Sequence, residues 1–170
     1  RRRHTRYPLV TGVQTCALPI SKDHPDWGVL WRYAAQERVT FFGAGAAFFT
    51  NCMKAGVQLS TIPGLSQVRA LGTTGSPLSA DVQQWGTAQF HAVHAAAGKP
   101  QEDIWWCNIS GGTDAGAYVG GHRDLPMAPG EMQCRFLGVS VEAWNEQGQP
   151  VIDEVGELVV TQPLPCMPPD

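Results

Sequence analysis

The sequence predicts an α/β fold: a parallel βαβαβ sheet portion, followed by a small antiparallel β subdomain. Two observations carry this prediction. In the earlier part of the chain, short runs of β-branched and aromatic residues alternate with segments of helical periodicity, and each run leads into glycines. After Gly121 the helical pattern stops, and short β-rich runs separated by turn residues replace it.

The first strand–helix unit begins with a helix over Trp27–Arg38, which Asp26 is placed to cap. Val39–Phe42 follows as a short buried strand and leads into Gly43–Gly45. A second helix is expected over Ala46–Ala55.

The same pattern then repeats. Val68–Thr73 is expected to be a strand that leads into Thr74–Pro77, and a long helix follows from Ser79 to Ala97. The apolar segment Asp103–Ile109 is the third strand, and it leads into the glycine run Ser110–Gly121. Connections of this length imply parallel strands, so the three glycine segments should share the carboxyl edge of one sheet, where α/β sheets bind ligands.

The organisation of the chain follows from these elements. Residues 21–128 form the parallel-sheet portion, residues 129–162 the small β subdomain, and residues 163–170 a proline-rich linker. Residues 1–20 are basic and contain no acidic side chain, and prolines interrupt any helix there. Because Val10–Ile20 looks like translated library-adapter sequence, we interpret residues 1–20 as an adapter or cloning artefact.

The charge balance excludes some classes of partner. The whole chain carries a formal net charge of −3 from 12 basic and 15 acidic residues. Setting aside the four arginines of the leader leaves 8 basic residues against the same 15 acidic ones, a net charge of −7. Binding to nucleic acid or to an anionic membrane therefore has no electrostatic support. No apolar run approaches the ~20 residues that span a bilayer, so no membrane association is expected.

The cysteines indicate a reducing compartment. Beyond the leader they are Cys52, Cys107, Cys134 and Cys166, and none stands in a C-x-x-C spacing. Buried, reduced thiols are the favoured interpretation, and zinc or a disulfide framework is poorly supported. A cytoplasmic protein is therefore expected.

The glycine run Ser110–Gly121 contains the strongest candidates for ligand-binding groups. Glycines let anionic groups approach backbone N–H donors, while Thr113 offers a hydroxyl and Asp114 a carboxylate. Such a pair suits a phosphate and its Mg²⁺ ion. The alternative is a tight turn with a solvated Thr–Asp pair.

Two other candidate sites are weaker. Gly43–Phe48 lacks one glycine of the dinucleotide fingerprint, and no acidic residue follows at the required spacing. His91 and His94 are spaced to share a metal ion on one helix face, but a solvated face is favoured because no third ligand is nearby.

Taken together, these segments resemble the AMP-forming acyl-CoA synthetases of the adenylate-forming superfamily, and within them the acetoacetyl branch. The resemblance extends from about residue 25 to residue 168, which is only an interior portion of such an enzyme. The segments that carry it are Val39–Phe48, Leu71–Leu78, Ile109–Asp114, Gly130–Arg135, Val141–Trp144 and Gly156–Thr161.

The resemblance implies an acetoacetate–CoA ligase that uses ATP, Mg²⁺ and CoA. Acetoacetate would be activated as an acyl-adenylate and then transferred to the thiol of CoA. By position, the residues implied are Gly75, Ser76 and Pro77 at adenine; Ser110, Gly111 and Gly112 between adenine and the acyl group; the catalytic pair Thr113 at the α-phosphate and Asp114 at the metal; and Gly43, Ala44, Gly45 and Gly111 at the acyl and CoA pocket.

The same resemblance implies an incomplete enzyme. A Lys-bearing phosphate loop upstream, a ribose-binding aspartate and a catalytic lysine downstream have no counterpart in this chain. We therefore expect the chain to be inactive alone and its partner to be the missing remainder of the same enzyme. The alternatives are a non-catalytic nucleotide-binding or interaction module with the same fold, and an α/β domain whose glycine turns are only turns.

Overall fold

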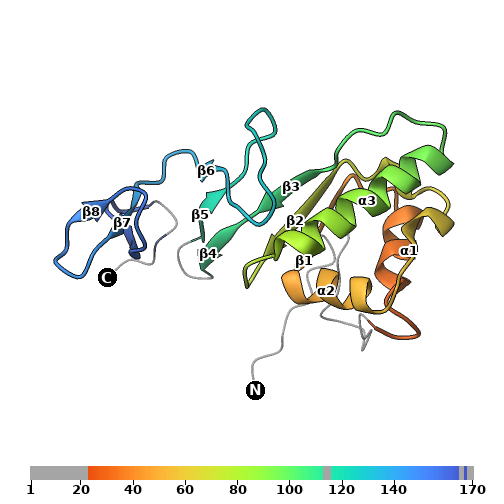
Figure 1. Ribbon diagram of the computed structural model, residues 1–170, viewed down its shortest axis with the longest axis horizontal. Helices are drawn as coiled ribbons and strands as arrows, with labels where there is room; N and C mark the ends of the chain where they lie inside the picture. Colours follow the sequence, from red (N-terminus) through yellow and green to blue (C-terminus); the bar gives the residue numbers. More distant parts are fainter. Residues whose placement is uncertain (1–22, 113–115, 165–166, 168–170) are drawn as a thin grey trace, which may run out of the picture.

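The computed structural model describes residues 23–112, 116–164 and 167 (Figure 1). Three helices and three parallel strands form the first part of the chain, and six short strands follow. The first part consists of α1 (Val29–Gln36), β1 (Phe41–Gly45), α2 (Ala46–Lys54), β2 (Ala70–Thr74), α3 (Ala80–Ala96) and β3 (Trp105–Asn108), with two 3-10 turns at Leu59–Thr61 and Leu65–Gln67.

The parallel sheet has the strand order β1-β2-β3, as the sequence predicts. Its register pairs Phe42 with Leu71 and Leu71 with Trp106, so these three side chains share one face of the sheet. At the carboxyl edge Gly45 pairs with Thr74, and Thr73 pairs with Asn108.

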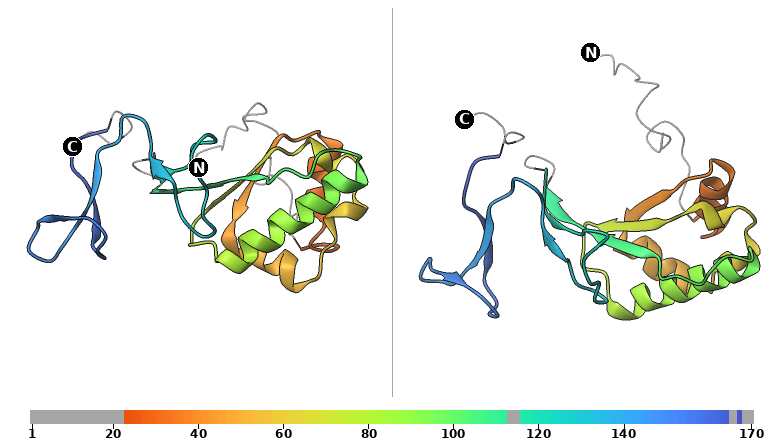
Figure 2. Two further views of the ribbon diagram at one scale, coloured as in Figure 1. Left: turned by 45° about the horizontal axis from the view of Figure 1, so that its top comes forward. Right: turned by 90° about the horizontal axis from the view of Figure 1, so that it is seen from above.

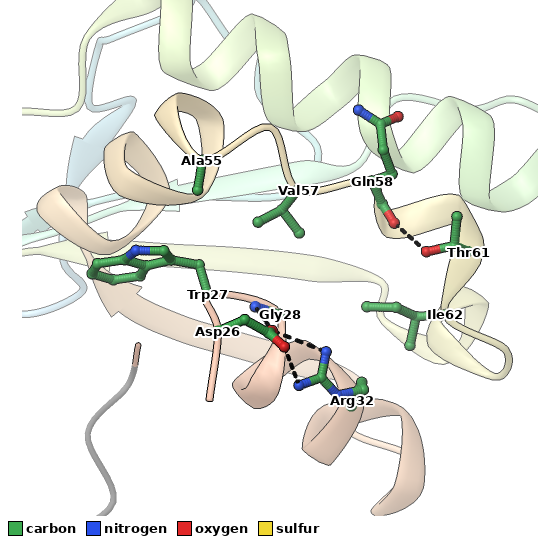
Figure 3. Close-up of a pocket in the computed structure, with 9 residues that line it drawn as sticks. All are labelled: Asp26, Trp27, Gly28, Arg32, Ala55, Val57, Gln58, Thr61 and Ile62. Carbon is green, nitrogen blue, oxygen red and sulfur yellow. Dashed lines mark hydrogen bonds and ion pairs between the residues drawn. The ribbon is translucent and has the colours of Figure 1, made fainter. Parts of the chain in front are cut away.

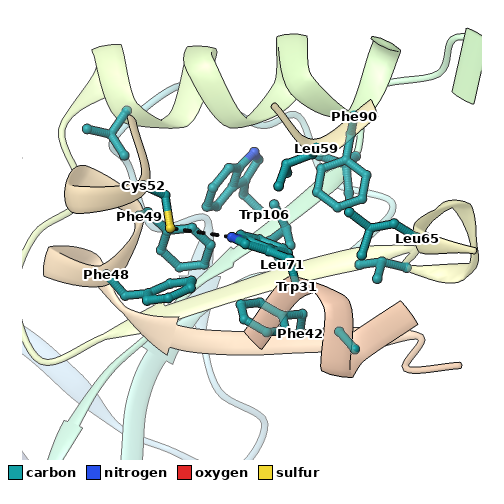
Figure 4. Packing of buried hydrophobic residues seen from close by; sticks show 14 of the residues in the cluster. Trp31, Phe42, Phe48, Phe49, Cys52, Leu59, Leu65, Leu71, Phe90 and Trp106 are labelled. Carbon is teal, nitrogen blue, oxygen red and sulfur yellow. Dashed lines mark hydrogen bonds between the residues drawn. The ribbon is translucent and has the colours of Figure 1, made fainter. Parts of the chain in front are cut away.

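All three helices pack on that same face, and the hydrophobic core lies between them and the sheet (Figure 4). Trp31 of α1 stacks on Phe42 at a centroid distance of 4.2 Å, and Phe49 of α2 meets Trp106 edge-on at 5.2 Å. Phe90 of α3 lies 6.0 Å from Trp31, so one indole contacts rings from three other elements. Burying large aromatic side chains supplies much of the hydrophobic stabilisation of so small a unit.

The opposite face of the sheet is covered unevenly. On the β3 side, Gln133 accepts a hydrogen bond from Trp105 Nε1 and donates to the carbonyls of Leu125 and Pro126, which holds the loop after β5 against the sheet. On the β1 side, Phe41 is 47% exposed and lies across Gly72. Among the described residues no helix packs on this face.

The glycine run differs from the expected loop, because two of its segments are strands. β4 (Ser110–Gly112) pairs antiparallel with β5 (Gly116–Gly120), and β6 (Cys134–Arg135) pairs with β5. The N–H of Ile109 still donates to Thr73 of the parallel sheet, so the chain passes from one sheet into the next within two residues. Glycine has low strand propensity, and backbone pairing to β5 overrides it here.

The last strands form a separate small sheet with the order β8-β7-β9. They are β7 (Val141–Trp144), β8 (Pro150–Val151) and β9 (Glu157–Val160), and the turn predicted at residues 145–148 joins the first two. Asn145 Oδ1 accepts hydrogen bonds from the backbone of Gln147 and Gln149. Figure 2 shows both small sheets to one side of the parallel sheet and its helices. The predicted β-rich part is thus two antiparallel sheets rather than one.

The start of α1 differs in detail from the expected one, whereas α2 begins at Ala46 and α3 has Ser79 at its N-cap, as predicted. α1 begins at Val29 with Gly28 at its N-cap, and the carboxylate of Asp26 instead binds the Gly28 N–H at 2.7 Å and the Arg32 guanidinium at 3.0 Å. Arg32 and the Gly28 N–H hold the pKa of Asp26 below its usual value. Within the part of the chain that the structure describes, no helix is both long enough and apolar enough to cross a bilayer.

Candidate functional site

The three glycine-bearing segments lie at the carboxyl ends of three adjacent parallel strands, as expected from the sequence. Gly43–Gly45 ends β1, Gly75–Pro77 follows β2, and Ser110–Gly112 follows β3. Their glycines are exposed, which a ligand that approaches the backbone requires.

Gly43, Ala44 and Gly45 belong to β1 and do not form the turn that the sequence suggested. They pair in register with Gly72, Thr73 and Thr74 of β2, and Gly45 is at the same time the N-cap of α2. The backbone therefore turns from strand to helix at one residue, and the extended Gly45 gives α2 an N-terminus at the edge of the sheet.

The segment after β2 is a true loop. Gly75, Ser76 and Pro77 are exposed, while Leu78 anchors the far end of the loop in the core with 4% of its surface accessible. Gly75 has φ of +86°, a left-handed conformation that favours glycine. A side chain at Gly130 would come within 3.3 Å of the Leu78 carbonyl, so the turn at Gly130 packs directly on this loop.

In the β4 segment, Gly111 is confined by its own partner strand. A Cβ at Gly111 would lie 2.4 Å from the Gly116 carbonyl oxygen and 2.6 Å from Ala117 Cα, both backbone atoms. Among the described residues, a Cβ at Gly112 would meet the Tyr118 hydroxyl at 3.4 Å and no backbone atom. The absence of a side chain at Gly111 is thus required by the hairpin itself, whatever the size of an acyl group nearby.

Thr113 and Asp114 lie outside the described residues. Their assignment to the α-phosphate and to Mg²⁺ therefore stays a prediction. Among the residues that the structure does describe, no three His, Cys, Asp or Glu side chains are grouped to hold a metal ion.

A buried polar cluster behind the carboxyl edge was not predicted from the sequence. Asn108 at the end of β3 is 6% exposed, and its Nδ2 donates to Gln83 Oε1 at 3.1 Å and to the Glu131 carbonyl at 2.9 Å. Gln83 of α3 is 1% exposed, and its Oε1 also accepts from the Gly130 N–H at 2.9 Å. The only sequence signal was a glutamine inside the apolar stripe of the third helix.

Two polar atoms of this region have no hydrogen-bond partner among the residues that the structure describes. Thr73 Oγ1 and Asn108 Oδ1 are both buried without a hydrogen bond, and their residues are register partners on β2 and β3. An unsatisfied buried polar atom costs about 1–3 kcal/mol, so each such atom in a native structure requires an explanation, of which a bound water, ion or catalytic role is one kind.

Two open hollows on the surface of the chain lie elsewhere. One of about 310 Å³ lies between the start of α1 and the segment after α2, where Asp26, Trp27, Val57 and Ile62 line it (Figure 3). A second, of about 260 Å³, lies beside α3 next to His91 and Asp103. Neither of these two hollows is lined by a candidate glycine.

The histidines and cysteines behave as structural groups. His91 Nε2 lies 2.7 Å from the Asp103 carboxylate on the surface. Cys52 and Cys107 are buried, as predicted, and burial raises the pKa of both thiols.

This arrangement of helices and strands matches a solved enzyme. The acetoacetyl-CoA synthetase from Streptomyces lividans superimposes with a TM-score of 0.75 and 40% sequence identity, over 86% of this chain and 22% of that one. The chain is homologous to the acetoacetyl-CoA synthetases. The resemblance inferred from the sequence motifs is thereby confirmed.

Curated acetoacetyl-CoA synthetases are similar to this chain in sequence. The one from Rhizobium meliloti is 38% identical over 161 residues, and that from Gallus gallus is 33% identical over 165 residues. Each match covers 94% of this chain but 23% of the relative, so the chain spans less than a quarter of the enzymes that it matches.

A second solved structure shares the fold at lower sequence identity. An anthranilate CoA ligase, solved in complex with anthranoyl-AMP, aligns with a TM-score of 0.58 at 16% identity over 77% of this chain. At that identity the likeness concerns the fold alone. No protein-family model matches the chain.

Proposed function

We propose that this chain is a portion of an AMP-forming acetoacetate–CoA ligase and that it carries part of the adenylate site. The observation that supports this most strongly is the identity of 38–40% with acetoacetyl-CoA synthetases over most of the chain, which includes all three glycine segments. The shared carboxyl edge of the three strands is the place where such a site is expected.

The proposed reaction has two steps. A carboxylate oxygen of acetoacetate attacks the α-phosphorus of ATP, and pyrophosphate leaves. The thiolate of CoA then attacks the carbonyl carbon of the acetoacetyl-adenylate, and AMP leaves with the electron pair of the broken C–O bond. Catalysis of this kind depends on positioned donors and cations that stabilise the developing negative charge.

In this proposal the chain supplies the adenine side of the site. The loop Gly75–Pro77 lies along the base, and Ser110–Gly112 separates the base from the acyl group. Thr113 donates its hydroxyl to the α-phosphate. Asp114 would hold Mg²⁺, an ion that neutralises phosphate charge when bound and prefers carboxylate and water oxygens.

The unpartnered carboxamide oxygen of Asn108 adds a contact that the motifs did not suggest. It is a buried acceptor at the end of β3, next to the segment assigned to the nucleotide. The exocyclic amine of adenine is a donor of the kind that this acceptor lacks. We therefore assign Asn108 Oδ1 to the N6 amine of the base.

The acyl and CoA side is assigned to Gly43–Gly45 with Gly111. In β1 these residues present no side chain larger than a methyl group, so a pantetheine chain could pass close to the strand. We also propose that the ligase works in the cytoplasm, in keeping with its reduced, buried thiols.

The test compares the 170-residue chain with the longer protein recovered from the same locus. We expect acetoacetate-dependent exchange of pyrophosphate into ATP from the longer protein and none from the chain alone. Thr113→Val and Asp114→Asn in the longer protein should each lower the exchange rate by about 10²-fold or more. Activity of the isolated chain would refute its incompleteness, and exchange with other acids but not acetoacetate would refute the substrate.

A further inference from the structure

We propose that Gln83 is a positioning residue that fixes the carboxamide of Asn108 for recognition of an aminopurine. This inference rests on the proposed nucleotide site and extends it to a residue of α3 that lies behind the edge. The observations that support this inference are the buried and partly buried hydrogen bonds that join α3, β3 and the Gly130–Glu131 segment.

Both protons of Asn108 Nδ2 are engaged in hydrogen bonds. A carboxamide nitrogen has two protons, and both are used here, one toward Gln83 Oε1 and one toward the Glu131 carbonyl. A rotation that exchanged oxygen and nitrogen would place the Asn108 oxygen against two acceptor oxygens. The orientation that leaves Oδ1 unpartnered is therefore the one that the surroundings impose.

Gln83 Oε1 accepts two hydrogen bonds, one from β3 and one from the turn at Gly130. This one oxygen accepts from Asn108 Nδ2 and from the Gly130 N–H, at 3.1 and 2.9 Å. Because Gln83 is 1% exposed, water does not compete for these bonds. Removing the oxygen would leave the Gly130 N–H and one Asn108 Nδ2 proton without this acceptor, so that the Glu131 carbonyl alone would hold the carboxamide and its orientation would be less restricted.

The consequence is base selectivity. Because its oxygen is the unpartnered atom of the carboxamide, Asn108 in this proposal accepts a hydrogen bond from the N6 amine of adenine but repels the O6 carbonyl of hypoxanthine. If the carboxamide were free to rotate, its NH₂ group would be available to the oxopurine as well. Gln83 thus acts on the choice of base through Asn108, with no contact of its own to the ligand.

Three variants separate this role from a structural one. Gln83→Leu removes the acceptor, Gln83→Glu keeps an acceptor oxygen at the same reach, and Gln84→Leu is the matched control at the exposed neighbouring position. In the 170-residue chain, amide exchange at Gly130 should be slow in the wild type, in Gln83→Glu and in Gln84→Leu, and at least about tenfold faster in Gln83→Leu.

The deciding readout is the ratio of kcat/KM for ATP to that for ITP in the longer enzyme. We expect Gln83→Leu to lower this ratio about fivefold, the worth of one ordinary hydrogen bond, and Gln83→Glu to retain it. A mere loss of stability would lower both activities together and leave the ratio unchanged, which would overturn the inference. If the wild-type longer protein uses neither nucleotide, the proposed function fails instead.

Discussion

At the scale of single residues, Gly111 and Gly112 look alike in the sequence and differ in the structure. A Cβ at Gly111 would meet the backbone of β5, whereas the described residue that a Cβ at Gly112 would meet is Tyr118, at the end of its side chain. The sequence could therefore locate the glycine segment but could not tell which glycine the hairpin requires, because that depends on the pairing partner.

Gly111→Ala should destabilise the chain by about 1–3 kcal/mol, because backbone atoms cannot move aside for a Cβ at 2.4 Å. Gly112→Ala should change the free energy of unfolding by less than about 1 kcal/mol. Urea denaturation of both variants measures the difference. Equal effects would mean that the hairpin is not formed as described.

Cysteine reactivity follows from burial at the same scale. Because the pKa values of Cys52 and Cys107 are raised by desolvation, both thiols carry less thiolate at neutral pH than an ordinary cysteine. Alkylation of the native chain, quantified for each peptide by mass spectrometry, should modify the half-buried Cys134 before either of them. Equal rates at Cys52 and Cys134 would contradict the packing of Cys52 against Trp31.

At the scale of elements, the strand–helix alternation could be predicted because each segment carries its own period and turn residues. β1, β2, β3 and the three helices all lie within a few residues of the predicted ranges. The β4–β5 hairpin could not be predicted, since its glycines have no strand preference and its stability comes from cross-strand bonds. The hydrogen bonds of Asn108 and Gln83 could not be predicted either, because they form only where α3, β3 and the Gly130–Glu131 segment meet.

The packing of α3 on β3 gives a test in which helix propensity and packing oppose each other. Gly86→Ala should favour the helix by about 1 kcal/mol, yet its Cβ would lie 2.4 Å from Trp106 Cζ2 in the core. We expect a net loss of stability of about 1–3 kcal/mol in urea denaturation. The exposed Ala88→Gly in the same helix should cost only about 1 kcal/mol, and stabilisation by Gly86→Ala would show that Trp106 does not pack there.

The end of α3 should make stability depend on pH. Burial, with the positive charges of Lys99 and His91, holds the pKa of His94 below its usual value of about 6.5. The unfolded chain then binds a proton more readily, so this contribution is complete above about pH 6.5 and is lost as the pH falls through the folded pKa. Unfolding measured at about pH 7.5 and 5.5 should show less pH dependence in His94→Gln than in the wild type. An equal pH dependence of the two proteins would show that His94 is not its source.

At the scale of the whole molecule, the parallel sheet has helices on one face only among the described residues. Parallel sheets are normally covered on both faces. The half-exposed Phe41 over Gly72 and the bare glycines of β1 therefore leave an apolar area open on the other face. This agrees with a chain that spans less than a quarter of the relatives that it matches.

We expect the isolated chain to self-associate through this face. Phe41→Gln should weaken the association by about tenfold, because it removes the largest apolar contact on the open side. Leu137→Gln, at a fully exposed position away from this sheet, should leave it unchanged. Sedimentation velocity over a range of concentrations measures both, and an equal effect of the two substitutions would place the association elsewhere.

The short path from β3 to β4 also limits how the gene can change. Only Ile109 separates Asn108, the last residue of one sheet, from Ser110, the first of the next. Since backbone groups alternate sides along an extended chain, one inserted residue would turn every N–H of Ser110–Gly112 to the opposite side. Two inserted residues would return these N–H groups to the original side but would shift them along the strand by about 6.6 Å. Insertions and deletions should therefore be absent at this point in functional descendants, while substitutions of Ile109 by other apolar residues remain tolerable.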